Sequence, residues 1–243
     1  MANLDTISTK PTENIDKKAA EKKTKAYKKD LFNLQNLLFA ENKRSLLIIL
    51  QGLDASGKDG TVRHVFSAVN PMGVNVKAFK APTAEEQAHD FLWRVHQHTP
   101  AKGMIEIFNR SHYEDILVPS VHKTLPKKQV EDRYDMINSF EKNLTENGTV
   151  ILKFFLHVSR KEQTERIKER RTLAHKKWKY DPADKLESPN HDKYLKVYES
   201  IFKKCGPGLP WHIVPADKKW YRNYYIAKTI VETLKDLKMK YPS

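Results

Sequence analysis

The chain has 243 residues, 39% of them hydrophobic, which suffices for one sizeable α/β domain and argues against two full ones. Because it has neither an apolar run of membrane-spanning length nor a secretory h-region, we expect a cytoplasmic protein with no membrane partner. The single cysteine, Cys205, excludes an internal disulfide framework and a thiolate zinc site, while the net charge of +14 favours polyanionic partners such as nucleic acids, phosphorylated small molecules or phosphate polymers.

The N-terminal part of the chain divides into an arm and the start of a domain. Residues 1–24 are polar and lysine-rich without apolar periodicity, which predicts a flexible or weakly helical basic arm. A single domain is expected over residues 25–243. It begins with a helix, because leucines recur at helical spacing between Leu31 and Leu38, and a buried strand over residues 45–51 follows.

Strands and helices alternate through the rest of the chain. Further strands are expected at residues 74–79, 104–108, 150–158 and 211–214. Capping boxes beginning at Thr83 and Ser159 predict the starts of two of the intervening helices. Five strands that are apolar enough to be covered on both faces predict a parallel sheet in a three-layer α/β/α sandwich. Ligands of such sheets bind at the carboxyl ends of the strands.

A phosphate-binding loop follows the first strand. Residues 52–60, GLDASGKDG, contain the pattern G-x-x-x-x-G-K between a predicted strand and a predicted helix. Gly52 and Gly57 let the backbone approach phosphate oxygens, the helix directs its positive N-terminus at them, and Lys58 adds a mobile charge. We assign phosphate binding to Gly52, Ala55, Ser56, Gly57, Lys58, Asp59 and Gly60.

Two carboxylates lie in this loop, where anions are expected to bind. Asp59 occupies the position at which the usual motif has a Ser or Thr that reaches magnesium, and Asp54 lies inside the loop. They are compatible with phosphate only if metal ions lie between them and the phosphates, or if one faces away. Asp54 is the better metal candidate, whereas Asp59 either contacts the metal or interacts with the helix dipole.

The segment after the third strand is the second candidate site region. In IEIFNRSHYEDILV, residues 105–118, Asn109 stands where phosphate-loop enzymes carry a metal-holding carboxylate, and Arg110 follows it. An amide can orient a metal-bound water, or it can simply cap the next turn. His112 and His122 are either phosphate contacts or packing residues.

A basic run comes after the fourth strand. Residues 166–179, RIKERRTLAHKKWK, hold seven Lys or Arg against one Glu, which predicts either a solvated helix face or a cover for polyanions. Trp178 in this run either stacks on a base or packs against the body. Lys77, Lys80 and Arg63 either extend a phosphate track or are scattered surface charges.

Together, GLDASGKDG, FNRSHYED and ERRTLAHKKWKYDPAD resemble the family-2 polyphosphate kinases over about residues 28–240. The resemblance implies a phosphate-loop kinase fold with a helical lid at about residues 166–188. It also implies Mg²⁺-dependent, reversible transfer of the terminal phosphoryl of polyphosphate to AMP or ADP, with ADP or ATP as the respective product and Mn²⁺ as an alternative metal. A homo-oligomer, dimer or tetramer, is expected on the same grounds.

The resemblance further implies roles for individual residues. The expected catalytic residues are Asp54, Lys58, Arg110, Arg170 and Arg171. The expected nucleotide and lid residues are Asn109, His112, Glu114, Asp115, Lys176, Lys177, Trp178 and Lys179. Asp54 would act with magnesium, with Asn109 as a second metal contact, and Arg110 would contact the transferring phosphoryl group. Family members commonly have Asp in place of Asn109, and Asn before SHYED resembles the subgroup that accepts both nucleoside mono- and diphosphates.

Two other functions remain as alternatives. An ATP-dependent nucleoside or nucleoside-monophosphate kinase would share the fold and the loop, but Asp59 and the strongly basic lid argue against it. A nucleic-acid-binding protein would match the charge, but aromatic residues do not interleave with the basic run as a stacking platform requires.

Overall fold

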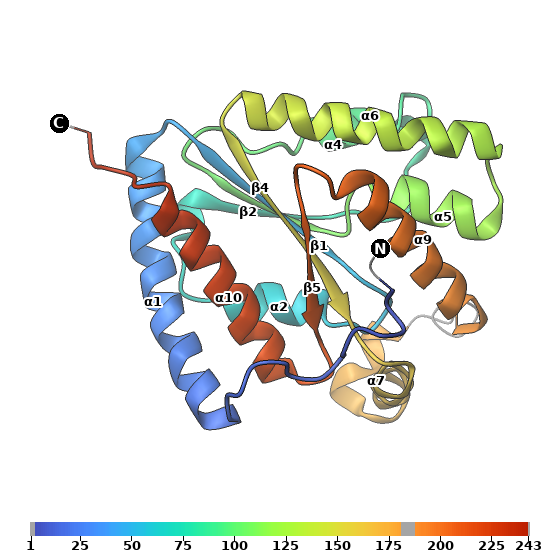
Figure 1. The fold of residues 1–243 in the computed structure, drawn as a ribbon, viewed down its shortest axis with the longest axis horizontal. Helices are drawn as coiled ribbons and strands as arrows, with labels where there is room; N and C mark the ends of the chain where they lie inside the picture. The colour runs from blue at the N-terminus through green and yellow to red at the C-terminus, as the bar shows by residue number, and fades with distance from the viewer. Residues whose placement is uncertain (1–2, 181–187, 243) are drawn as a thin grey trace.

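A computed structural model describes residues 3–180 and 188–242. It contains one five-stranded parallel sheet in the order β2-β3-β1-β4-β5 (Figure 1). The strands are β1 (Ser45–Gln51), β2 (Val74–Ala78), β3 (Ile105–Asn109), β4 (Thr149–His157) and β5 (Trp211–Pro215). All five lie close to their predicted ranges. β1 is central, and Leu50 near its end pairs with Asn109 at the end of β3, so the two predicted site segments meet at one sheet edge.

Helices cover both faces of the sheet and form the predicted three layers (Figure 1). One face is covered by α1 (Lys17–Glu41), α2 (Lys58–Val65) and α10 (Lys219–Asp236), and the other by α5 (Glu114–His122), α6 (Lys127–Glu146) and α9 (His191–Cys205). Successive side chains of a strand point to opposite faces of the sheet. In β1, Ile48 therefore packs on the face covered by α1, α2 and α10, and Ile49 packs on the face covered by α5, α6 and α9.

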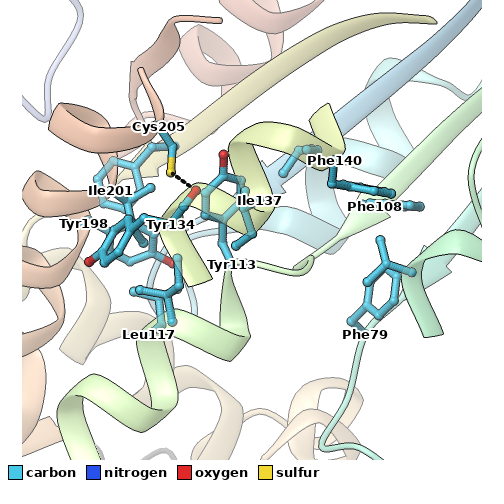
Figure 2. Packing of buried hydrophobic residues seen from close by; sticks show 14 of the residues in the cluster. Phe79, Phe108, Tyr113, Leu117, Tyr134, Ile137, Phe140, Tyr198, Ile201 and Cys205 are labelled. Atoms are coloured by element: carbon cyan, nitrogen blue, oxygen red, sulfur yellow. Dashed lines mark hydrogen bonds between the residues drawn. The ribbon is translucent and has the colours of Figure 1, made fainter. Parts of the chain in front are cut away.

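The core beneath α5, α6 and α9 extends to the site. Figure 2 shows its aromatic residues, among them Phe79 and Phe108, whose rings meet edge to face at 4.9 Å. The Cys205 thiol is buried and donates to the Tyr134 carbonyl at 3.9 Å. Burial raises the pKa of this thiol to about 12, so Cys205 is a packing residue. Tyr198 belongs to the same cluster, and its hydroxyl accepts the Gly52 N–H at 3.2 Å. The core thereby positions the start of the phosphate-binding loop.

The remaining described elements connect these layers. They are η1 (Pro71–Gly73), α3 (Ala84–Gln87), α4 (Trp93–His96), α7 (Arg160–Thr172), η2 (Ala174–Lys179) and η3 (Ser188–Asn190). The capping box at Thr83 is confirmed. At Ser159 only half of the predicted box forms: its hydroxyl accepts the Glu162 N–H, but the Glu162 carboxylate binds Arg166 instead.

Residues 3–24 pack against the domain, which the expected flexible or weakly helical arm did not include. α1 begins at Lys17 rather than Lys25, with Asp16 capping it, and Ala20 is fully buried. Leu4 is only 1% exposed, and its N–H donates to the Glu199 carboxylate at 2.8 Å. These anchors are isolated residues separated by polar ones, so they leave no periodic pattern in the sequence. Every helix within the described ranges is too short or too polar to cross a lipid bilayer.

Candidate active site

The phosphate-binding loop has the backbone that its sequence predicts. Gly52 and Gly57 adopt φ values of 147° and 109°, and Ala55 is also left-handed at 59°. A Cβ on Gly57 would lie 1.8 Å from Arg222 Nη1, so the space as well as the backbone requires glycine. α2 begins directly after Gly57, and the N–H groups of its first turn have no carbonyl partner within the helix. The loop and this helix start therefore form an anion cradle.

Lys58 is held inside the loop that it serves. Its ammonium donates to the Gly52 carbonyl at 2.6 Å and to the Leu53 carbonyl at 3.2 Å. Burial, reinforced by the nearby Arg110, lowers the pKa of Lys58 to about 8. A cation whose charge is disfavoured by burial gains a large benefit from an anionic ligand, so the electrostatics of Lys58 favour phosphate binding.

Arg110 links the loop to the segment after β3. It adopts a left-handed backbone, with φ of 63°, and its guanidinium lies 2.6 Å from the Asp54 carboxylate and 3.8 Å from that of Glu114. Burial raises the pKa of Glu114, although the neighbouring Arg110 opposes this shift. The Asn109 amide donates to Asp59 at 2.9 Å. Both loop carboxylates are thus contacted from the end of β3.

Most of the predicted catalytic residues surround one cavity of about 700 Å³. Its lining includes the loop and lid residues Asp54, Ala55, Gly57, Lys58, Asp59, Gly60, Lys80, Asn109, Arg110 and Arg170. A second cavity of about 530 Å³ shares Phe79, Lys80 and Arg110 with it and adds Glu114 and Asp115. Arg110 therefore lies where two cavities meet. This geometry suits a reaction between two ligands, one in each cavity.

Some predicted site residues lie elsewhere. His112 is fully buried, with Nε2 3.2 Å from Glu141 and its ring against Phe140, so it faces the core and not a ligand. His112 follows a buried segment by four residues in the sequence. This position alone could not tell a histidine that faces the core from one that faces a ligand. Arg63 and Lys77 do not line the 700 Å³ cavity. Lys77 instead lies over the Phe79 ring at 5.8 Å.

The lid residues are partly brought to the site. Arg170 on α7 lines the 700 Å³ cavity, but Arg171 lies over the Tyr180 ring at 5.8 Å and is absent from that lining. Lys176 pairs with Glu169 at 2.6 Å, and Trp178 is 77% exposed. Lys177 is exposed as well. The Lys179 side chain and residues 181–187 of the expected lid lie outside the described residues.

Two buried arginines beneath the loop were not identified from the sequence. Arg166 donates to the carbonyls of Ala55 and Ser56 at 3.1 and 2.9 Å, and Arg222 donates to the Ser56 carbonyl at 3.3 Å. A peptide group directs its C=O and N–H oppositely, so holding the Ser56 carbonyl from below turns the Gly57 N–H toward the cradle. Arg166 belongs to the basic run, which gave no sign that it would be buried. Arg222 had no sequence signal.

The side chains available as metal ligands determine which metal sites are feasible. Within residues 3–180 and 188–242, no three His, Cys, Asp or Glu side chains are grouped so as to hold a metal ion. Asp54 and Asp59 are nevertheless both at the 700 Å³ cavity. Magnesium typically takes one or two carboxylates and completes its shell with waters and substrate phosphates. The residues therefore fit a magnesium ion that substrate phosphates help to hold, and not a cage made by protein alone.

Comparison with known proteins places this geometry in a family. The family model described as polyphosphate kinase 2 matches residues 14–242. The AMP/ADP-polyphosphate phosphotransferase of Meiothermus ruber is 45% identical over 227 residues, covering 93% of this chain and 85% of its own. The ADP-polyphosphate phosphotransferase of Rhodopseudomonas palustris is 40% identical over 225 residues, covering 87% of this chain and 78% of its own.

A solved structure gives the same result for the fold. The crystal structure of polyphosphate kinase 2 from Arthrobacter aurescens superposes with a TM-score of 0.97 at 39% identity, covering all of this chain and 88% of that one. The match includes the phosphate-binding loop, the segment after β3 and α7. On the family model, the relatives and the shared fold, the chain belongs to the polyphosphate kinase 2 family.

Proposed function

We propose that this protein transfers the terminal phosphoryl group of inorganic polyphosphate to AMP and ADP. The observation that carries the proposal is the pair of cavities that meet at Arg110, one containing the phosphate-binding loop. Family membership supports polyphosphate as the donor, and the names of the Meiothermus ruber and Rhodopseudomonas palustris relatives support AMP and ADP as acceptors. Reversible transfer, a cytoplasmic location and a dimer or tetramer belong to the same proposal.

The donor end binds at the loop. Lys58 and the first turn of α2 neutralise and orient its phosphates, and Arg170 approaches from α7 across the same cavity. Phosphoryl transfer depends mainly on positioning and charge neutralisation, so these groups supply much of what the reaction requires. The strongly basic α7 segment also excludes water that would hydrolyse the polymer.

The acceptor binds in the 530 Å³ cavity. Buried Arg94 is fixed there by Asp115 at 3.0 Å, and the Arg133 guanidinium lies 4.6 Å from the centre of the Phe91 ring. A base can stack on such a planar pair, while its phosphate points toward Arg110. Arg110 then lies beside the transferring phosphoryl group and stabilises the charge on its oxygens.

A divalent ion completes the electrostatics. Asp54 is the residue proposed to hold magnesium, or manganese, together with phosphate oxygens, and the ion supplies charge neutralisation between the two substrates. Asn109 keeps Asp59 in place through their hydrogen bond and is proposed as a second contact through water. Since an amide adds no negative charge at this point, Asn109 also suits acceptors with either one or two phosphates.

The test is an assay with each acceptor supplied separately. Purified protein, magnesium and long-chain polyphosphate are mixed with AMP or with ADP, and the products are separated by chromatography. We expect ADP and then ATP from AMP, and ATP from ADP. Formation of ATP from ADP alone would remove the dual-acceptor assignment. No product with polyphosphate, but phosphorylation of a nucleoside or AMP by ATP, would establish the alternative ATP-dependent kinase.

A further inference from the structure

A third cavity, of about 570 Å³, is lined by the N-terminal half of α1 and the start of α10. These two helices lie side by side on one face of the sheet (Figure 1). We call the cavity the α1–α10 cavity. α1 contributes Lys17, Lys25 and Lys28 to its wall, and the start of α10 contributes Lys218 and Lys219. It shares no lining residue with the cavity at the phosphate-binding loop. Five lysines around one hollow are costly unless an anion compensates them.

The carboxylates in this wall are already engaged. Glu21 pairs with Lys17 at 3.9 Å, and Glu162 pairs with Arg166 at 2.9 Å. Asp217 accepts the backbone N–H that precedes α7 at 2.8 Å. In the part of the chain that the structure describes, the remaining four lysines of the wall have no carboxylate within 4.0 Å. The cavity therefore presents a net positive charge to whatever enters it.

The electrostatics of neighbouring groups agree with this conclusion. Burial lowers the pKa of Lys219, and Arg166 lowers it further. Burial also lowers the pKa of His64, which lines the cavity from α2, and nearby cations including Lys28 add to the shift. These cations disfavour one another's charge, which is typical of a site that an anion completes.

The α1–α10 cavity is connected to the loop through one short contact chain. Asn223 lines the cavity and accepts from Arg222 Nη2 at 2.9 Å, and Arg222 donates in turn to the Ser56 carbonyl. α2 spans the same interval: His64 lies six residues after Lys58, or about 9 Å along a helix axis. A linear anion of several phosphate units is long enough to occupy both places.

We propose that the α1–α10 cavity binds inner phosphate units of a long polyphosphate chain whose terminal phosphate lies at the loop. The proposal rests on the proposed function and adds the determinant of chain-length preference. A chain of three phosphates occupies the loop without reaching the cavity, whereas a long chain engages both. The cavity thus contributes to affinity for long donors and leaves the chemical step unchanged.

The test compares long-chain polyphosphate with tripolyphosphate as donors for ADP. In the triple variant Lys25→Gln, Lys28→Gln, Lys219→Gln we expect KM for the long chain to rise about tenfold, since each exposed charge contact contributes a modest factor. KM for tripolyphosphate and kcat with either donor should be unchanged. The dependence of KM on salt should also become shallower for the long chain, because fewer counterions are displaced.

A matched control removes the same charge elsewhere. The control is a second triple variant on α6, which lies on the opposite face of the sheet: Lys127→Gln, Lys128→Gln, Lys142→Gln. It tests whether the overall electrostatic field of the protein is sufficient to explain the change in KM. Equal rises in KM for both triple variants, or an unchanged ratio of long-chain to tripolyphosphate KM, would overturn the proposal. Weakened binding of a labelled oligonucleotide with no change toward polyphosphate would overturn it in favour of a nucleic acid. Absence of activity with any polyphosphate in the unaltered protein would instead reject the proposed function.

Discussion

Lys58 illustrates how single residues are prepared for charged ligands. Two carbonyls of its own loop bind its ammonium, and burial lowers its pKa to about 8. In the proposed function, a phosphate oxygen replaces a carbonyl as its partner and offsets the cost of keeping this charge buried. Asp54 is arranged in the same way, since Arg110 compensates its charge at 2.6 Å.

Removal of either side chain should therefore abolish most of the activity. For Lys58→Ala and Asp54→Ala we expect kcat/KM to fall by about 10²–10³, as for other groups that stabilise transition-state charge. Unfolding temperature should stay close to that of the unaltered protein. Lys77→Ala, outside the 700 Å³ cavity, is the control and should remain active. A near-normal rate in one of the two variants would remove that residue from the catalytic set.

The pKa of Lys58 also predicts a pH dependence. A lysine must be protonated to neutralise phosphate, and kcat/KM follows the ionisation of the free enzyme. Because burial depresses this pKa to about 8, kcat/KM for polyphosphate should decline above pH 8, well below the ordinary lysine value of 10.5. Measurement of kcat/KM over a series of pH values tests this decline. Lys58→Arg should be less active but flat over that range, and an equal decline in this variant would assign the ionisation to another group.

At the scale of elements, the loop depends on residues far away in the sequence. Arg166 from α7 and Arg222 from α10 hold its carbonyls from below, and burial lowers the pKa of Arg222 to about 10. The Gln163 amide donates to the Asp54 carbonyl at 3.0 Å. α7 is therefore attached to the loop near its N-terminus, while Arg170 reaches the cavity from near its C-terminus.

This packing predicts a specific cost at Gly57. For Gly57→Ala, the clash with Arg222 adds to backbone strain, so we expect a loss of about 2–4 kcal/mol in unfolding free energy together with loss of activity. Gly208→Ala is the control: it has a left-handed φ of 87° but no atom within 4 Å of the added carbon. It should cost about 1–2 kcal/mol from strain alone. Chemical denaturation of both variants measures the difference, and equal losses would contradict a role for the Arg222 contact.

The sequence predicted local features better than remote ones. The five strands and the loop were found because their apolar runs and the G-x-x-x-x-G-K pattern are contiguous. Arg222 was missed because its role depends on where α10 crosses the loop, which no local pattern encodes. For His112 the sequence left both a ligand contact and a packing role open, and its ring turns into the core toward Glu141.

At the scale of the whole molecule, the N-terminal segment fastens distant parts of the fold. The Leu4 carbonyl lies 3.1 Å from His157 Nε2 at the end of β4, and Thr9 binds Asp217 after β5. Leu4 itself is buried in the cluster beneath α9. These residues therefore act as part of the body and stabilise the base of α7.

Truncation of Leu4 should accordingly destabilise the entire domain. Leu4→Ala removes a fully buried side chain, and we expect a loss of about 2–5 kcal/mol in unfolding free energy, measured by chemical denaturation. Met136→Ala on α6, a half-exposed residue, is the control and should change stability by less than about 0.5 kcal/mol. If Leu4→Ala lowered the unfolding free energy no more than the control does, the N-terminal segment would be a flexible or weakly helical arm as the sequence predicted.

The arginine contacts beneath the loop have a consequence for biosynthesis. A ribosome releases the chain from its N-terminus, so residues 52–60 emerge long before Arg166 and Arg222. β5 and α10, which complete the sheet and one helical layer, follow the loop in the chain by more than half of the given sequence. Before these later segments emerge, the loop carbonyls lack two of their donors and Leu4 lacks its partner on α9. We therefore expect nascent chains to acquire phosphate binding only after α10 has emerged from the ribosome, in a single step.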